Sequence, residues 1–386
     1  MTQGEIEALS KTIEKLSAEL ELDIMKDIVR RMKANDNLVT SSAAYQIERL
    51  QQMGRTDEYI KKRLQEYLKV SEAEINKVYV VETQKQYEKF EVLFKKTGDI
   101  YVPYSKNAEM QVVINAMLTQ TKNTFRNFAD TAAFSSIVNG RTVTTALAEY
   151  YWDVLDNALM GITTGAFDYN TALRKAVTKM TRSGLRTVDY ASGRSYRIES
   201  AARMALMTGY SQINQELNSQ MAEALGTNTF EVSYHIGARP SHQEWQGRVY
   251  THEELVNTCE LGQVTGLCGA NCYHWYNPFI EGVSVRNYTD DQLKSMMEEE
   301  NRFRTYDGKE YTTYTGLQQQ RKLELIIRTL REEVALLTEG DGADFDILAA
   351  KIKYRQTLQE YTKFSESVGL PEQKERIYMD GLGKVA

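Results

Sequence analysis

Apolar residues recur at intervals of three and four positions over most of the chain, the pattern of helices with one buried face. The first such seam consists of Ile6, Leu9, Ile13, Leu16, Leu20, Ile24 and Ile28. It predicts one long N-terminal helix that packs against another helix or another subunit.

Residues that typically begin or end helices divide the next part of the sequence into separate predicted helices. The sequence Thr40-Ser41-Ser42 can cap a second helix, which we expect to stop at Gly54. Ser71 and Glu74 have the spacing of a capping box and predict the start of a further helix. The first clear break is the segment 97–103, which contains a glycine and a proline.

Three more helices are predicted beyond this break. The first carries closely spaced apolar residues from Val112 onward and is expected to end near Gly140. The second is expected at 144–160, and a third at about 198–225, with Gly226 as its stop signal. Residues 171–204 contain turn-forming positions and are not expected to form one continuous helix.

The part of the chain after Gly226 begins with a short strand, since Phe230, Val232 and Tyr234 alternate with polar residues. Thr289 and Gln292 can cap a short acidic helix, and Asp307-Gly308 predicts a hairpin turn. Two apolar stripes flanking a glycine-rich turn then predict a helical hairpin. The stripes are Leu323, Ile326, Leu330, Val334 and Leu337, then Leu348, Ile352, Leu358 and Tyr361.

Together these patterns predict a mainly α fold, with long helices and a C-terminal helical hairpin around one small α+β module rich in Cys and His. We expect four domains. They are an N-terminal helical region (1–100), a helical domain with a basic segment (101–228), the Cys/His module (229–288) and the C-terminal hairpin (289–386).

Composition narrows the class of protein. Only 4 of the 386 residues are proline, which agrees with a helical chain, and the net charge of −6 disfavours a general nucleic-acid binder. No apolar run reaches membrane-spanning length, and the start of the chain does not resemble a secretion signal. The odd number of cysteines, 3, favours a reducing compartment over a disulfide framework.

Candidate chemistry is concentrated in one segment, because all 4 histidines and all 3 cysteines lie between Tyr234 and Ser284. Cys268, Cys272 and His274 are closely spaced candidate zinc ligands, and Cys259, His242 or His235 could supply a fourth. In the alternative that we favour, Cys272 is a small buried apolar residue and His274 a hydrogen-bonded structural one. Zinc is the only cofactor that these residues suggest.

Two enzymatic alternatives have weaker support. His252 and Glu254 match the first half of a zinc-deaminase motif, but Cys268 and Cys272 have the wrong spacing for the second half. A nucleophilic Cys272 with His242 as its base would require the fold to bring the two together. We therefore expect no enzymatic activity and no catalytic residues.

Other residues of the module are expected to be architectural. A flexible glycine and a rigid proline suit a sharply folded loop, Trp245 can fill a small core, and the Asn271 amide can satisfy loop backbone groups. The proposed structural motif comprises His235, Gly237, Arg239, Pro240, His242, Trp245, Gly247, Asn271, Cys272 and His274.

A basic stretch precedes the module. Its candidate DNA-contact residues are Arg174, Lys175, Lys179, Arg182 and Arg186. They could contact the phosphates of double-stranded DNA, or they could form a solvated face whose charges pair locally, which we consider the more common outcome.

The module resembles the minor capsid protein 2 family of tailed bacteriophages. The residues that carry the resemblance are His235 to His242, Trp245-Gln246-Gly247, Gly266-Leu267, Asn271-Cys272, His274 and Pro278-Phe279. It continues downstream through Tyr311-Thr312, Gln320-Arg321 and Gly369-Leu370, and upstream at Asp189 to Arg194 and Arg203-Met204. More distantly, the module is similar to the head-morphogenesis domain of Mu-type phages. Tyr273 stands where the family usually has arginine, and Cys268 is not a fixed part of its pattern.

The resemblance implies a structural protein of the phage head, internal and associated with the portal, that aids head assembly, DNA packaging or ejection. Its partners would be the portal protein, other capsid proteins and packaged DNA, without a membrane. It would be located in the virion, and in the host cytoplasm during assembly. One rival is a zinc-dependent hydrolase delivered with the virion, and another is a cytoplasmic scaffold absent from mature particles.

Overall fold

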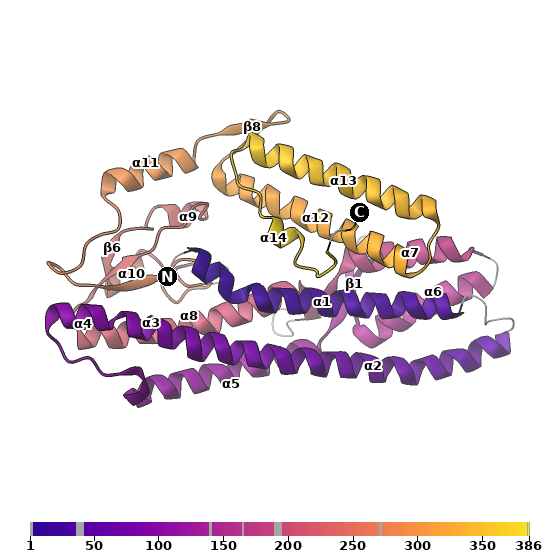
Figure 1. The fold of residues 1–386 in the computed structure, drawn as a ribbon, viewed down its shortest axis with the longest axis horizontal. Coiled ribbons are helices and arrows are strands. Elements are labelled where there is room, and N and C mark those ends of the chain that lie inside the picture. The colour runs from indigo at the N-terminus through magenta and orange to yellow at the C-terminus, as the bar shows by residue number, and fades with distance from the viewer. Residues whose placement is uncertain are drawn as a thin grey trace. The chain divides into compact units, whose positions relative to one another are not determined.

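The computed structural model describes residues 3–35, 42–138, 141–163, 166–188, 195–269, 272–383 and 385. Helices make up most of this part of the chain, and short strands form small sheets (Figure 1). The expected mainly α fold is therefore confirmed. None of the described helices has both the length and the apolar character needed to cross a membrane.

The first 130 residues are helical wherever they are described, apart from a loop near residue 100. The elements are α1 (Gln3–Asn35), α2 (Ser42–Asn76), a π-helical segment (Lys77–Glu82), α3 (Thr83–Lys89), α4 (Glu91–Thr97), the 3-10 turn Tyr104–Lys106 and α5 (Ala108–Asp130). The predicted seam of α1 is buried except at Leu16, which is half-buried. The predicted break is confirmed at Gly98, where the backbone turns left-handed with φ of 82°.

Two predicted boundaries within α2 are wrong. Helix α2 continues through Gly54, and Ser71 lies inside it as a buried residue instead of capping a new helix. A glycine inside a helix costs about 1 kcal/mol relative to alanine, which the packing of a long helix can offset. A glycine or a capping-box sequence therefore marks a boundary only when packing ends there too.

A four-stranded antiparallel sheet replaces the end of a predicted helix. Its strands are β1 (Ala133–Val138), β2 (Arg141–Ala146), β3 (Leu185–Val188) and β4 (Ser195–Arg197), in the order β2-β1-β3-β4. The helix predicted to reach Gly140 ends at Asp130. The strands contain many β-branched residues, and Asn139-Gly140, which lies outside the described residues, is a hairpin-turn sequence.

Helices α6 (Leu147–Thr163), α7 (Tyr169–Ser183) and α8 (Ile198–Ala224) come from the same part of the chain. The predicted interruption of the basic segment is confirmed at Gly184, where α7 ends with φ of 66°. The predicted end of α8 is confirmed by Gly226, which follows it with φ of 60°.

The chain forms two compact units, each assembled from three separate segments. The first contains residues 1–12, 71–125 and 203–318, and the second contains 13–70, 126–202 and 319–386. The segment 229–288 lies wholly within the first unit. The division into four continuous domains stays a prediction.

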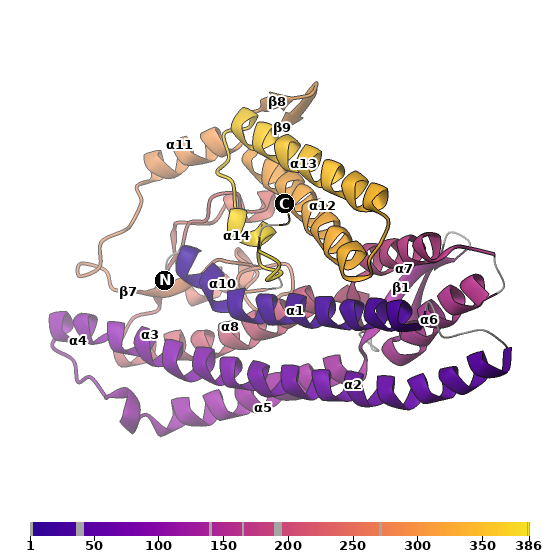
Figure 2. The same cartoon turned by 45° about the vertical axis from the view of Figure 1, so that its right-hand side comes forward.

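The C-terminal part contains the predicted capped helix, strand hairpin and helical hairpin. Its elements are α11 (Asp290–Glu300), β8 (Arg304–Tyr306), β9 (Lys309–Tyr311), α12 (Thr313–Glu339), α13 (Asp344–Ser367) and α14 (Lys374–Ile377). Thr289 and Gln292 form the predicted capping box of α11. Figure 2 shows α13 running back along α12.

The predicted apolar stripes of this hairpin are only partly correct. On α12, Ile327 is buried whereas Ile326 is 48% exposed. On α13, Tyr361 is buried as predicted, but Leu348 and Ile352 are 55% and 45% exposed. Apolar spacing identified the helix but not which side of it is covered, because α13 carries apolar residues on two faces.

A group of buried charges lies in the second unit. Glu21 accepts a hydrogen bond from Arg197 at 3.3 Å, and Glu199 accepts one from Arg328 at 2.7 Å. Glu332 lies near them and is only 6% exposed. Its burial raises the pKa to about 8, and the charge of Glu21 raises it in the same direction, while Arg197 and Arg328 lower it.

We expect Glu332→Gln to stabilise the folded chain at pH 8 and to change its stability little at pH 4.5. The folded carboxyl keeps a proton that the unfolded chain, with an ordinary pKa of 4.5, has released. The stability that this group contributes is therefore present below pH 4.5 and is lost as the pH rises towards 8. Chemical denaturation at both pH values should show a gain on the order of 1–3 kcal/mol at pH 8 only. An equal effect at both would contradict this.

Candidate functional site

The Cys/His module is built on a three-stranded antiparallel sheet. Strand β5 (Thr229–Val232), the strand predicted at Phe230, lies between β6 (Val249–Thr251) and β7 (Tyr276–Phe279). Short helices α9 (Pro240–Gln243) and α10 (His252–Asn257) complete it. The buried core consists of Ala222 of α8 with Phe230, Val232, Trp245, Leu255, Cys259, Leu267, Cys268 and Tyr276.

Two glycines and a proline shape the backbone that leads into this site. Pro240 is in the first turn of α9, where its missing N–H costs nothing and its fixed φ suits the helix. Gly237 and Gly247 have φ of 76° and 72°, which other residues adopt only with strain. A Cβ atom at Gly247 would also lie 2.5 Å from Leu293 Cδ2.

We expect Gly247→Ala to reduce the free energy of unfolding by about 2–4 kcal/mol, because it combines left-handed backbone strain with overpacking against Leu293. Gly282→Ala is the matched control, since Gly282 has φ of 78° but no atom within 4 Å of the added Cβ. The control should lose only about 1–2 kcal/mol. Equal losses in chemical denaturation would show that the Leu293 contact has no cost.

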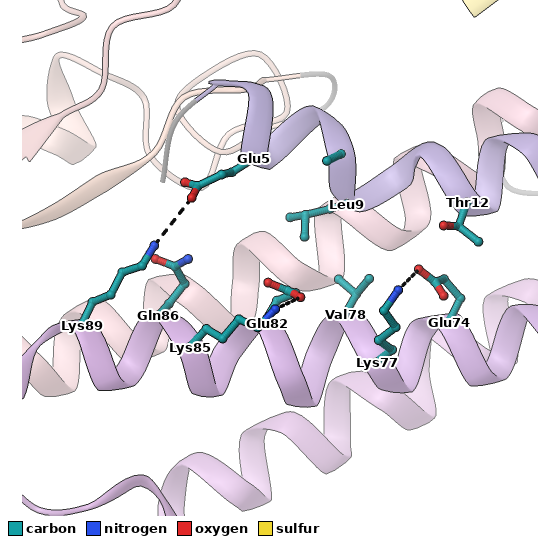
Figure 3. A pocket seen from close by; sticks show the side chains of 11 residues that line it. Glu5, Leu9, Thr12, Glu74, Lys77, Val78, Glu82, Lys85, Gln86 and Lys89 are labelled. Carbon is teal, nitrogen blue, oxygen red and sulfur yellow. Dashed lines mark hydrogen bonds and ion pairs between the residues drawn. The ribbon is translucent and has the colours of Figure 1, made fainter. Parts of the chain in front are cut away.

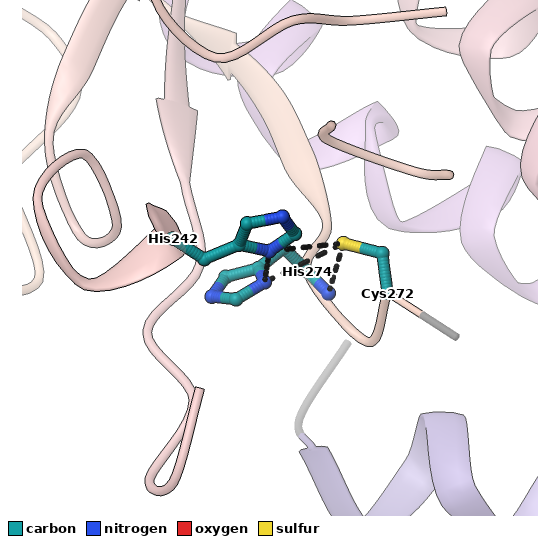
Figure 4. A group of neighbouring side chains, drawn as sticks. All are labelled: His242, Cys272 and His274. Carbon is teal, nitrogen blue, oxygen red and sulfur yellow. Dashed lines mark hydrogen bonds between the residues drawn. The ribbon is translucent and has the colours of Figure 1, made fainter. Parts of the chain in front are cut away.

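Three side chains of the module converge to form the His/Cys cluster: His242, Cys272 and His274 (Figure 4). His242 comes from α9, and the other two come from the segment before β7. The Nδ1 atoms of His242 and His274 are 3.4 Å apart, and Cys272 Sγ is 3.8 Å and 3.5 Å from them. The two histidines are buried, and Cys272 is half-buried.

Hydrogen bonds on the far side of each imidazole fix where its proton lies. His242 Nε2 donates to the Thr265 carbonyl at 2.8 Å. The Gln246 Oε1 atom accepts from the backbone N–H of His235 at 3.0 Å, so His274 Nε2, 2.8 Å away, must also donate to it. Both Nδ1 atoms of the neutral rings therefore present lone pairs to the centre of the cluster.

Burial keeps the cluster uncharged in the absence of an ion. It lowers the pKa of His242 and pushes that of His274 well below the ordinary range, and the neighbouring His235 lowers the latter further. Burial also raises the pKa of the Cys272 thiol. The hydrogen bond from the backbone N–H of His274 lowers this pKa, but its effect is smaller than that of burial. The cluster is thus made of two neutral imidazoles and one thiol, which can bind a transition metal once the thiol has lost its proton.

The structure combines the predicted metal ligands differently. Cys272 and His274 lie together, but the third member is His242, one of the candidates for a fourth ligand, in place of Cys268. The Cys268 thiol is buried in the core and donates to the His274 carbonyl at a distance of 3.7 Å. Cys259 is also a core residue and His235 pairs with Ser233, so neither belongs to the cluster.

The remaining motif residues support the cluster from outside. The Trp245 ring packs against both imidazoles, with centroids 4.5 Å from His242 and 4.8 Å from His274. Arg239 donates to the Thr265 carbonyl at 3.4 Å. Asn271 lies outside the described residues. Thr265 was not predicted because it acts through its backbone, which leaves no sequence signal.

The geometry of the cluster gives little support to the two enzymatic alternatives. His242 and Cys272 do meet, but the raised pKa of the buried thiol disfavours the thiolate that a nucleophile requires. Glu254 is engaged in the capping box of α10, where it accepts from the Thr251 backbone N–H at 2.8 Å. It is therefore committed to a structural role.

The basic residues of α7 form an exposed face. Lys175 Nζ lies 3.2 Å from the centroid of the Phe167 ring, and Arg174 pairs with Asp346 at 3.0 Å. Lys179 and Arg182 are also exposed on this helix. Arg186 differs, because it is half-buried on β3 and donates to the Ser195 carbonyl at 3.2 Å. Arg186 was grouped with the other basic residues because it is close to them in sequence. It lies beyond the end of α7, however, and so is not on the same helix face.

A charged pocket of about 500 Å³ lies beside the first turns of α1 (Figure 3). Ion pairs surround it: Lys77 with Glu74, Lys85 with Glu82, and Lys89 with Glu5. Because these charges neutralise one another, the pocket has no dominant charge to select a ligand.

Comparison with known proteins identifies a family. The family model described as phage minor capsid protein 2 matches residues 1–363. No curated protein and no solved structure matches the chain.

Proposed function

Since the chain belongs to the phage minor capsid protein 2 family, we propose that it is an internal, portal-associated component of the phage head that aids head assembly, DNA packaging or ejection. The observation that carries the proposal is the family match, which covers all of the first compact unit and the second as far as residue 363. Membership supports a structural role in the capsid and a place in the virion. The contact with the portal protein and the part in DNA packaging or ejection go beyond family membership and are our proposal.

An exposed apolar face of α13 supports a role in assembly. Phe345, Leu348 and Ile352 are 77%, 55% and 45% exposed, and their spacing of three and four residues places them on one side of the helix. Contiguous apolar surface on a folded protein often marks a contact with another protein. We assign this face to the contact with the portal protein.

Native mass spectrometry of the chain co-expressed with the portal protein of its own gene cluster tests this assignment. A complex of fixed stoichiometry is expected, and Leu348→Asp should weaken it at least tenfold. Val112→Asp is the matched control, because Val112 is 69% exposed on another helix, α5, and should leave the complex intact. If the natural chain forms no complex, the portal-associated role is wrong.

The basic face of α7 is our candidate for contact with packaged DNA. Neutralising Lys175, Lys179 and Arg182 together with glutamine should lower the affinity for double-stranded DNA and reduce the salt slope of binding by up to about 3. The control replaces the exposed Lys61, Lys62 and Lys69 of α2 with glutamine, which removes the same charge. Fluorescence anisotropy over a range of salt concentrations measures both. Equal losses would mean that only net charge matters.

A further inference from the structure

The three atoms at the centre of the His/Cys cluster have the spacing of ligands around one tetrahedral ion. With Zn–N bonds of about 2.05 Å and Zn–S bonds of about 2.3 Å, tetrahedral angles place two nitrogens about 3.3 Å apart and nitrogen and sulfur about 3.6 Å apart. The observed distances are 3.4 Å between the nitrogens, and 3.5 Å and 3.8 Å from them to the sulfur. One zinc ion would therefore reach all three with almost no movement.

The hydrogen bonds within the cluster are incomplete without such an ion. Both imidazoles use their only N–H outside the cluster, on the Thr265 carbonyl and on Gln246 Oε1. Two Nδ1 lone pairs then face each other, and the single thiol proton of Cys272 can satisfy only one of them. A cation that replaces this proton satisfies both nitrogens and the sulfur at once.

We propose that His242, Cys272 and His274 form a zinc site, with Nδ1, Sγ and Nδ1 as ligands. Two imidazoles and one thiolate are a ligand set that suits zinc, and carbonyl acceptors on the outer imidazole nitrogens are the usual way in which such ligands are oriented. The half-buried Cys272 provides the side from which a fourth ligand, such as water, reaches the ion. On binding, the thiol proton is released to solvent.

The ion would fasten the short helix α9 to the segment before β7. His242 and Cys272 are separated by 30 residues, and this interval includes the loop of Thr265 and Cys268. A cross-link between such positions removes conformational freedom from the unfolded chain and so stabilises the module. Zinc therefore has a structural role here, which is independent of whether the chain contacts the portal.

The test is zinc binding by the purified full-length chain. The chain is stripped with a chelator, dialysed and titrated with zinc chloride alone, and native mass spectrometry counts the ions bound. One zinc per chain is expected, together with a melting temperature several degrees higher. Cobalt(II) in place of zinc should give the visible absorption of a tetrahedral site and a thiolate-to-cobalt charge-transfer band. Failure of the natural chain to bind either ion overturns the proposal.

Two variants separate this site from binding elsewhere. Cys272→Ser should lose the charge-transfer band and bind zinc at least a hundredfold more weakly. Cys268→Ala is the matched control. It removes a thiol that belongs to the same loop but is not part of the cluster, so this variant should still bind one zinc. The assigned ligands would be contradicted if Cys272→Ser bound zinc as well as the natural chain does. They would also be contradicted if only Cys268→Ala lost zinc binding. Because the cobalt spectrum uses the natural chain, misfolding of a variant does not prevent a decision.

Discussion

Replacing Trp245 with alanine is expected to unfold the Cys/His module while leaving most helices of the chain intact. The side chain is only 5% exposed and packs against the rings of His242 and His274. Removing a buried tryptophan typically costs about 3–5 kcal/mol, which is a large part of the stability of a small module. Hydrogen exchange measured by mass spectrometry should show lost protection in β5, β6 and β7.

Trp245→Phe is the control for this prediction. It keeps an aromatic ring packed against the two imidazoles and should lose less than half as much stability. Retained protection of the three strands in the alanine variant would show that the module does not depend on its tryptophan. Lost protection throughout α1 and α12 as well would show that the module does not unfold by itself.

The second large effect is expected at a buried ion pair in the second unit. Arg331 of α12 is fully buried and donates two hydrogen bonds of 2.9 Å to Asp380, which is 1% exposed. The same guanidinium donates to the Gly383 carbonyl at 2.6 Å and lies 4.6 Å from the centroid of the Tyr378 ring. The pair thus fastens the C-terminal residues to the helical hairpin.

Asp380→Ala should lower the free energy of unfolding by about 3–5 kcal/mol, because it leaves a buried guanidinium without its counter-charge. The double variant Arg331→Met, Asp380→Leu should lose much less, since it removes both charges together. Breaking the exposed pair of Lys95 and Glu91 with Glu91→Gln should change stability by less than about 1 kcal/mol. Urea denaturation compares the three. Similar losses in the single and double variants would contradict this account.

Local signals in the sequence predicted local structure well. The capping box of Thr289 and Gln292, the turn at Asp307-Gly308 and the helical hairpin are all present, because each depends on residues close together in the chain. The β1–β2 hairpin was missed because helical apolar spacing was extended past Asp130 into β-branched residues. The exposed face of α13 was not predictable, since the residues that cover a helix are distant in sequence.

The candidate site illustrates the same limit. Spacing identified Cys272 and His274, which are two residues apart, but it could not select His242 over Cys268 as their companion. That choice depends on the left-handed backbone at Gly237, the start of α9 at Pro240 and the burial of Cys268 in the core. The tautomers that expose both Nδ1 lone pairs depend on Thr265 and Gln246, whose roles appear only when the chain is folded.

Quantitative mass spectrometry of purified, DNA-filled phage particles tests the central claim, a structural role within the phage head, most directly. We predict that the chain is present in a small, fixed copy number that keeps a constant ratio to the portal protein between preparations. Its presence only in infected-cell lysates, with none in the purified particles, would contradict the account and would instead indicate a scaffold that leaves before the head matures.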